Sequence, residues 1–147
     1  MARFEATVEI DRPVAEVFAF LADGENDRKF SPRVQDVSKS PPGPTAVGTV
    51  FRSTVKDAGM TTRKEFRISD LVTPTRIRWN ELSSNLVTAR EGGYDLEPLA
   101  ADRTRVRIFN DLEGHRLGKL LVGLAVAAAR KDAPAFGLRI KAAVEVF

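Results

Sequence analysis

Hydrophobic and polar residues alternate at the start of the chain, and the pattern then changes to helical spacing. Alternate residues from Phe4 to Ile10 are apolar, which predicts a strand over ARFEATVEI. Pro13 leads into VAEVFAFLAD, whose apolar residues recur every three or four positions until Gly24. This spacing predicts a first short helix, and a second helical turn is expected over residues 25–30.

The middle of the chain, residues 47–112, has the alternation and turn signals of five antiparallel strands. Turn signals fall at residues 58–59, 73–74, 84–85 and 99–102. One continuous register then places four pairs of opposite charge on one face, which indicates that this face meets solvent. The expected pairs are Arg52 with Glu65, Arg78 with Glu91, Glu97 with Arg103, and Asp95 with Arg105.

The opposite face of the predicted sheet is mostly apolar but also carries several polar side chains. They are Lys64, Glu81, Arg90, Tyr94 and Asn110. Burying a charge is costly unless it is paired or solvated. Two interpretations stay open: these groups line a wet cavity, or the register slips at that end of the sheet.

The last third of the chain predicts a long helix that begins with the apolar run GKLLVGLAVAAAR. Only ten uncharged residues separate Lys119 from Arg130, whereas a spanning helix needs about twenty, so membrane insertion is not expected. Two apolar stripes, offset around the helix, are both expected to face the sheet, with a bend near Pro134 to reconcile them. The first stripe is Leu117, Leu120, Leu121, Leu124 and Ala128, and the second is Phe136, Ile140, Ala143, Val144 and Phe147.

Composition narrows the functional classes further. The 147 residues are expected to form one domain, over 1–147. The net charge is +3, and the basic residues alternate with acidic ones instead of forming a nucleic-acid-binding stripe. There is no cysteine and a single histidine, His115, so no metal site is expected. No phosphate loop or dinucleotide fingerprint occurs, and no cofactor is expected. The amino-terminal residues lack the apolar core of a signal peptide, which favours a cytoplasmic location.

Three segments of the sequence resemble the START-like, helix-grip (SRPBCC) superfamily. They are VEIDRPVAEVFAFLADGENDRKFSPRV, GTVFRSTV and FRISDLVTPTRIRWNE, followed by the closing helix. The branch that the chain most resembles is that of polyketide cyclase/dehydrase and lipid-transport-like proteins. The resemblance implies an α+β fold: a curved antiparallel sheet of about seven strands wraps around a long C-terminal helix, with two short helices after the first strand.

The same resemblance implies a cavity between the sheet and the closing helix, in which relatives hold lipids, steroids or polyketides. The small residues of that helix, from Gly118 to Ala129, are interpreted as leaving room for a ligand. Small residues suit close packing of the helix on the sheet equally well, so that alternative stays open.

Eight residues are predicted to contact a ligand: Lys64, Trp79, Glu81, Arg90, Tyr94, Asn110, His115 and Leu121. Glu81 could orient a polar group or act as a base, or instead form a salt bridge that stabilises the fold. Arg90 could bind an anionic head group or stack on Trp79. His115 could transfer a proton, or simply lie at the start of the helix.

Three functions compete at this level. The first is a binder of a small hydrophobic molecule such as a lipid, polyketide or steroid. The second is an enzyme of the cyclase/dehydratase type that uses the same cavity, although no motif of catalytic residues stands out. The third is an interaction or stress-related regulatory module without a ligand. A homodimer stays open in all three.

Overall fold

Alternation of apolar and polar residues builds most of this molecule as antiparallel sheet, and one long helix crosses it. The computed structural model describes residues 2–57 and 59–147. The described elements are, in chain order, β1 (Ala2–Ile10), α1 (Val14–Ala22), the 3₁₀ helix η1 (Gly24–Lys29), β2 (Val34–Ser40), β3 (Val50–Asp57), β4 (Met60–Val72), β5 (Arg76–Glu81), β6 (Val87–Ala100), β7 (Arg103–Gly114) and α2 (Gly118–Glu145).

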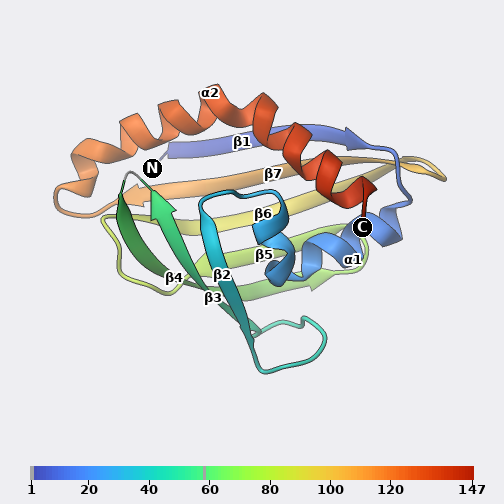
Figure 1. Ribbon diagram of the computed structural model, residues 1–147, viewed down its shortest axis with the longest axis horizontal. Coiled ribbons are helices and arrows are strands. Elements are labelled where there is room, and N and C mark those ends of the chain that lie inside the picture. Colours follow the sequence, from blue (N-terminus) through green and yellow to red (C-terminus); the bar gives the residue numbers. More distant parts are fainter. Residues whose placement is uncertain (1, 58) are drawn as a thin grey trace.

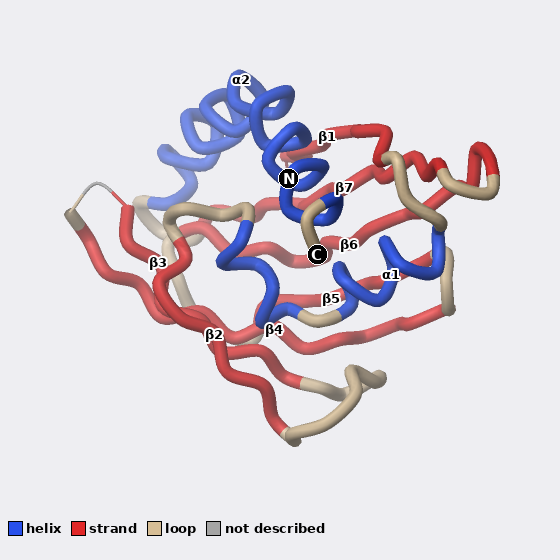
Figure 2. Tube along the Cα trace, turned by 45° about the vertical axis from the view of Figure 1, so that its right-hand side comes forward, coloured by secondary structure: helices blue, strands red, loops and turns tan. Residues whose placement is uncertain are grey.

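The seven strands form one antiparallel sheet in the order β1-β7-β6-β5-β4-β3-β2. The sheet is strongly curved, and α2 crosses above the β1–β7 side of it while α1 and η1 lie nearer the middle (Figure 1). At the other end, β2 curls round until it lies beside η1 (Figure 2). This is the α+β helix-grip architecture that the sequence predicted, including the two short helical segments after the first strand.

The predicted strand registers give most side chains their correct face but, in two hairpins, the wrong partners. Arg52 lies opposite Glu65 as predicted, and their side chains form an ion pair at 3.2 Å. Ala58, in the predicted turn between them, lies outside the described residues. In β5–β6 and β6–β7 the pairing is displaced by two residues, so that Glu97, for example, lies opposite Arg105 instead of Arg103. A shift of two keeps every side chain on its face, because successive side chains alternate.

The predicted orientation of the Arg90 side chain is wrong. The sequence placed it on the inner face of the sheet, but its side chain is exposed. The pairing of β6 with β7 is interrupted between Ala89 and Glu91. An extra residue at such a bulge changes the face to which the side chains point, and alternation alone does not reveal where a bulge occurs.

Strand β2 was not predicted from the pattern. Its two apolar residues, Val34 and Val37, are three positions apart, which breaks the alternation expected of a strand. The pairing of β2 with β3 shifts between Val34 and Asp36, and this irregularity brings both valines to the pocket on the inner face.

Helix α2 faces the sheet with most of the second predicted stripe but not with the first. Residues at alternating steps of four and three form its buried or half-buried side, and this stripe runs unbroken past Pro134. They are Val122, Val126, Ala129, Ala133, Phe136, Ile140 and Ala143. The helix arches above the sheet (Figure 1), but a single stripe of this spacing needs no offset between its two halves.

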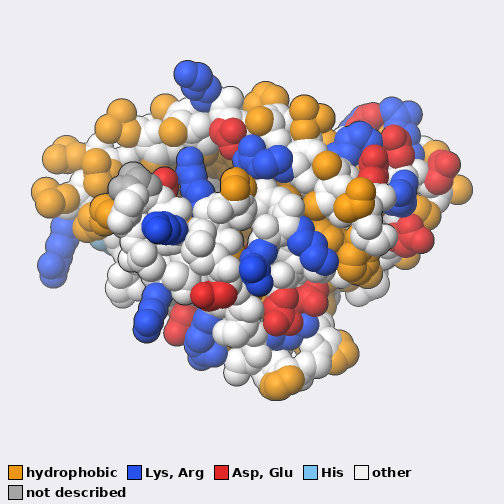
Figure 3. Space-filling model, viewed as in Figure 1, with side chains coloured by type: hydrophobic (Ala, Val, Ile, Leu, Met, Phe, Trp, Pro, Cys, Tyr) orange, Lys and Arg blue, Asp and Glu red, His pale blue; other side chains and the backbone are white. Residues whose placement is uncertain are grey.

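The leucine stripe of α2 therefore faces solvent, contrary to the prediction. Leu117, Leu120 and Leu124 are exposed by 68%, 77% and 71%, and Leu121 by 43%. In the space-filling view, hydrophobic side chains gather over this part of α2 (Figure 3). The leucine stripe was assigned to the sheet because it is the more apolar side of the helix. In the structure, the side with the smaller residues packs against the edge of the sheet instead. Among the described residues, no helix is both long and apolar enough to cross a membrane.

The hydrophobic core lies between the sheet, α1 and the C-terminal half of α2. Its largest fully buried side chains include Phe20, Ile10, Ile77 and Ile140. On the outer face of the sheet, a network of ion pairs covers the neighbouring strands. Its members are Arg103 and Arg105 with Glu9, Arg107 with Glu5 and Asp95, and Arg78 with Asp95. These arginines are engaged with acids, as the interleaved charges in the sequence indicated.

Candidate functional site

A cavity of about 250 Å³ lies inside the curve of the sheet. Strands β3 to β7 form its floor, α1, η1 and β2 close the side opposite to it, and α2 contributes a single side chain, Phe136. No residue between Gly118 and Ala129 lines it, so the small residues of the helix do not create this space as predicted. The volume is near the lower end of the about 300–1,000 Å³ usual for ligand sites, which indicates a small ligand.

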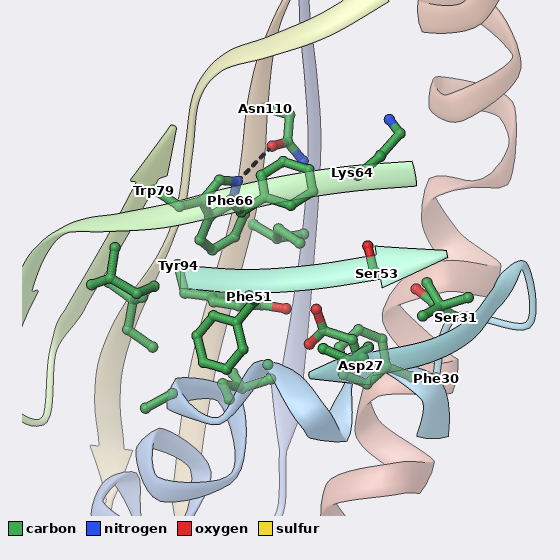
Figure 4. A pocket seen from close by; sticks show the side chains of 18 of the residues that line it. Asp27, Phe30, Ser31, Phe51, Ser53, Lys64, Phe66, Trp79, Tyr94 and Asn110 are labelled. Atoms are coloured by element: carbon green, nitrogen blue, oxygen red, sulfur yellow. Dashed lines mark hydrogen bonds between the residues drawn. The ribbon is translucent and has the colours of Figure 1, made fainter. Parts of the chain in front are cut away.

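Aromatic rings make up much of the cavity wall. Phe30, from the end of η1, meets Phe136 edge to face with ring centroids 5.9 Å apart. Phe51 packs against Gly24, where a Cβ atom would come within 2.8 Å of the ring. These contacts join η1 to α2 and to β3, and so they hold η1 over the strands on the opposite side of the cavity (Figure 4).

At the other end of the cavity, Trp79 is held in a defined orientation. Its indole Nε1 donates a hydrogen bond to Asn110 Oδ1 at 3.1 Å, and its ring meets Tyr94 edge to face at 5.2 Å. Gly92 lies beneath this pair: a Cβ atom there would be 2.1 Å from Asn110 Oδ1 and 2.4 Å from Trp79 Nε1. Glycine at 92 is therefore required for the two side chains to meet.

Asp27 brings a carboxyl group into this otherwise mostly apolar space. Gly24, Asp27 and Phe30 all line the cavity, because residues three apart align on one side of a 3₁₀ helix. Burial, together with the negative charge of Asp23, raises the pKa of Asp27 to about 7. At neutral pH this carboxyl group can both give up and accept a proton.

Tyr94 and Lys64 complete the polar lining with Ser31, Ser53 and Asn110. Tyr94 is only 4% exposed, and burial, reinforced by the charge of Asp27, raises the pKa of its phenol well above the ordinary value. The phenol is therefore neutral and can donate a hydrogen bond. Figure 4 shows its hydroxyl end directed toward Asp27, while the ammonium group of Lys64 points away from that carboxyl.

Four of the eight residues predicted to contact a ligand line this cavity, namely Lys64, Trp79, Tyr94 and Asn110. The other four do not. Arg90 and Leu121 are exposed, and Glu81 and His115 lie at a separate surface hollow near the start of α2. Lining the cavity shows only where a side chain lies. A role in ligand binding therefore stays a prediction for all eight residues.

Glu81 stabilises a loop rather than pairing with the cations that were expected beside it. Its carboxylate accepts hydrogen bonds from Ser83 Oγ at 2.6 Å, Asn85 Nδ2 at 2.7 Å and the backbone N–H of Ala89 at 2.9 Å. No ion pair joins it to Lys64 or Arg90 in the described part of the chain. The carboxylate thus organises the β5–β6 connection, which is closer to the structural alternative than to a catalytic role.

His115 occupies the same hollow as Glu81. Its Nε2 atom lies 2.8 Å from Thr88 Oγ1, and its backbone N–H donates to the carbonyl of Leu86 at 2.7 Å. These contacts attach the start of α2 to the β5–β6 loop. They do not bring the imidazole to the cavity beneath η1.

Sequence reasoning missed Asp27, Ser31, Phe30 and Phe136 as lining residues. For Asp27 and Phe30, the useful signal was the spacing of three within GENDRKF, which matches a 3₁₀ turn. Phe136 had been assigned correctly to an inward stripe but not to the cavity. Within the described residues, no group of three or more histidine, aspartate or glutamate side chains is placed to hold a metal ion.

Comparison with known proteins agrees with this architecture. A family model described as polyketide cyclase / dehydrase and lipid transport matches residues 1–145. No curated protein sequence matches the chain.

Several solved structures share the fold at low sequence identity. TTHA0849 from Thermus thermophilus is 18% identical with a TM-score of 0.76, over 99% of this chain and 98% of that one. The Zhui aromatase/cyclase from Streptomyces sp. R1128 is 21% identical with a TM-score of 0.74, over 97% and 90% of the two chains. A START superfamily protein from Mycobacterium smegmatis is 16% identical with a TM-score of 0.65, over 90% and 97%. At such identities, these likenesses concern the fold alone.

Proposed function

Because the chain belongs to the polyketide cyclase/dehydrase and lipid-transport family, we propose that it binds a small hydrophobic molecule in the cavity between the sheet and η1. The observation that carries this proposal is the cavity itself: about 250 Å³, walled by aromatic and aliphatic side chains, with a few polar groups at defined positions. A cytoplasmic location and a homodimer stay predictions beside it.

Titration with the neutral fluorescent probe N-phenyl-1-naphthylamine tests the proposal. Ser53 lines the cavity, whereas its neighbour Thr54 does not, because successive side chains of a strand point to opposite faces. Ser53→Phe is expected to fill the space and to lower the affinity for the probe by about tenfold or more, which corresponds to about 1.4 kcal/mol. Thr54→Phe adds the same ring on the other face and is the matched control.

The two variants separate the outcomes. Equal binding by the Ser53→Phe and Thr54→Phe proteins would place the probe elsewhere on the surface. Absence of binding by the unaltered protein, together with no small molecule released on denaturation and seen by mass spectrometry, would contradict a ligand-binding function.

A second candidate function is an enzyme of the cyclase or dehydratase type, and Asp27 is the observation that favours it. A carboxyl group with a pKa of about 7 can exchange protons with a bound substrate at neutral pH. In a dehydration, a β-hydroxy ketone loses one water to give the unsaturated ketone: the ionised carboxylate would take the α-proton, and the carboxyl group so formed would protonate the hydroxyl as the C–O bond breaks and the C=C bond forms. Mass spectrometry that finds no loss of water from such substrates, or an equal loss with Asp27→Asn, would contradict this function.

A further inference from the structure

Two polar groups inside the cavity lack a protein partner within the described part of the chain. No described backbone or side-chain group donates a hydrogen bond to the carboxyl group of Asp27, and the hydroxyl of Tyr94 has none either. Buried polar groups in folded proteins are almost always hydrogen-bonded. Tyr94 is 4% exposed and Asp27 is half-buried, and both line the cavity. A partner for their polar atoms therefore comes from what occupies the cavity.

The two groups come from opposite sides of the same space. Asp27 projects from η1, whereas Tyr94 projects from β6 on the floor of the sheet, and its hydroxyl is directed toward the carboxyl (Figure 4). Most of the other lining residues are apolar, and the remaining polar ones are Ser31, Ser53, Lys64 and Asn110. A few polar groups at defined positions in a mostly apolar cavity orient a ligand through its own polar group.

We propose that Asp27 and Tyr94 form the polar recognition site of the cavity, and that they bind a neutral molecule with an apolar body and one carbonyl oxygen, to which both side chains donate hydrogen bonds. This inference rests on the proposed function, since it names the class of ligand for the same cavity.

Both side chains are donors in their neutral forms. Burial raises the pKa of Tyr94, and burial with the charge of Asp23 raises that of Asp27 to about 7. Both donors face the same cavity, and a carbonyl oxygen, with its two lone pairs, can accept a hydrogen bond from each.

The charges around Asp27 do not favour its ionised form. On the η1 side, Asp23 is itself paired with Lys39 of β2 at 3.3 Å. From α2, Arg139 is held by Asp132 at 2.8 Å and donates to the Phe30 carbonyl at 3.1 Å. The ammonium group of Lys64, on β4, points away, and the lining residues of β3 are uncharged.

A carboxylate ligand does not suit this end of the cavity. It would bring a second negative charge to Asp27, and two carboxyl groups that share a site resist ionisation together. The site therefore discriminates between a ketone or ester and the corresponding acid. A hydrocarbon of the same shape would fill the cavity but leave both donors unsatisfied.

Three naphthalene probes of similar size test the inference by isothermal titration calorimetry: 2-acetonaphthone, 2-isopropylnaphthalene and 2-naphthoate. At a pH of about 5.5, where Asp27 is protonated, the ketone is expected to bind about tenfold more tightly than the hydrocarbon. It is also expected to bind more tightly than the carboxylate. As the pH rises through about 7 the preference for the ketone should fall, because ionised Asp27 no longer donates.

Three variants assign the effect to its residues. Asp27→Leu and Tyr94→Phe each remove a donor and should reduce the preference for the ketone while the hydrocarbon still binds. Asp27→Asn keeps a donor, so the preference should persist and no longer depend on pH. Thermal unfolding of each variant confirms that it folds, and if Asp27→Leu does not fold, Tyr94→Phe and the pH profile of the unaltered protein decide.

The outcomes distinguish the two proposals. Binding of all three probes with equal affinity, or an unchanged ketone preference in Asp27→Leu and Tyr94→Phe, would overturn the recognition site and leave a binding cavity. Binding of 2-naphthoate as tightly as the ketone would overturn the selection of neutral ligands. If none of the three probes binds, the recognition site fails, and the proposed function fails with it only if N-phenyl-1-naphthylamine does not bind either.

Discussion

Single residues determine the chemistry of the cavity, and Asp27 is the one with the largest effect. It is the only carboxyl group among the described lining residues, and its ionisation is opposed by burial. A group whose pKa is raised on folding binds its proton more tightly in the folded state. The folded state is therefore favoured while the proton is bound, and this advantage is lost as the pH rises.

The effect of Asp27 on stability can be measured through Asp27→Asn. Its pKa rises from 3.8 to about 7 on folding, so the unaltered protein should lose stability between a pH of about 4 and about 7 that the variant does not lose. At a pH of about 8 the variant should be the more stable by up to about 4 kcal/mol, since each pKa unit between 3.8 and about 7 corresponds to 1.36 kcal/mol. Urea unfolding at a series of pH values checks this. A constant difference between the two proteins would contradict a raised pKa.

Gly92 shows how much one absent side chain can decide. The Trp79–Asn110 hydrogen bond exists only because nothing projects from position 92 into the same space. The sequence shows GG at 92–93, which marks a point of close approach in a strand but does not say what approaches.

Among the elements, α2 is the one whose role changed most between sequence and structure. Its C-terminal half is buried through Ile140, Ala143 and Val144. Its N-terminal half meets the sheet edge with small residues and Val126, and its leucines face solvent. The start of the helix is held instead by Gly118, where a Cβ atom would be 1.8 Å from the carbonyl oxygen of Leu86.

Two glycines on this helix are expected to respond in opposite ways to alanine. Gly118→Ala should lower the free energy of unfolding by about 1–3 kcal/mol, because the helix start must move away from the β5–β6 loop. A Cβ atom at Gly123 would meet no other atom within 4 Å, so Gly123→Ala should raise the free energy of unfolding by about 0.5–1 kcal/mol through helix propensity.

Urea denaturation of both glycine variants and the unaltered protein provides the comparison. Similar effects of the two substitutions would mean that α2 is not attached at Gly118. An increase in the free energy of unfolding by both substitutions would lead to the same conclusion, since helix propensity alone would then determine the effect of each.

At the scale of the whole molecule, the outer face of the sheet is held by charge and the inner face by apolar contact. Phe109 illustrates the difference: it is 3% exposed although it belongs to the outer face, because Arg3, Arg78 and Arg107 lie over its ring at 4.5–5.1 Å. Arginines that cover a ring and bind acids at the same time exclude water from a surface that would otherwise be wet.

This network predicts a loss of stability in acid that is separate from the effect of Asp27. Burial on its own would raise the pKa of Asp95, but hydrogen bonds from Arg78 and Arg107 outweigh it and lower that pKa. A lowered pKa stabilises the fold above the unfolded value of about 3.9, and the benefit is lost as the pH falls below it.

Asp95→Asn is therefore expected to cost about 1 kcal/mol at neutral pH and less at a pH of about 3. Thermal unfolding at both pH values measures the difference. Salt of about 1 M should reduce the neutral-pH cost by screening. A cost that persists unchanged in acid would assign it to packing rather than to charge.

The sequence by itself determined all the elements except β2, and the faces of the strands away from the bulges. Alternation in β1 and β3–β7 and the period of α2 follow from local geometry, and a shift of two residues in pairing does not change which side chains point inward. Trp79, Tyr94, Lys64 and Asn110 were placed in the cavity for that reason.

Only the tertiary structure decided what depends on contacts between distant segments. The bulge that turns Arg90 outward, the exposure of the α2 leucines and the position of Asp27 across from Tyr94 each reflect how one element settles against another. Local pattern carries no information about those contacts, because the energy that selects them comes from packing and desolvation in the assembled fold.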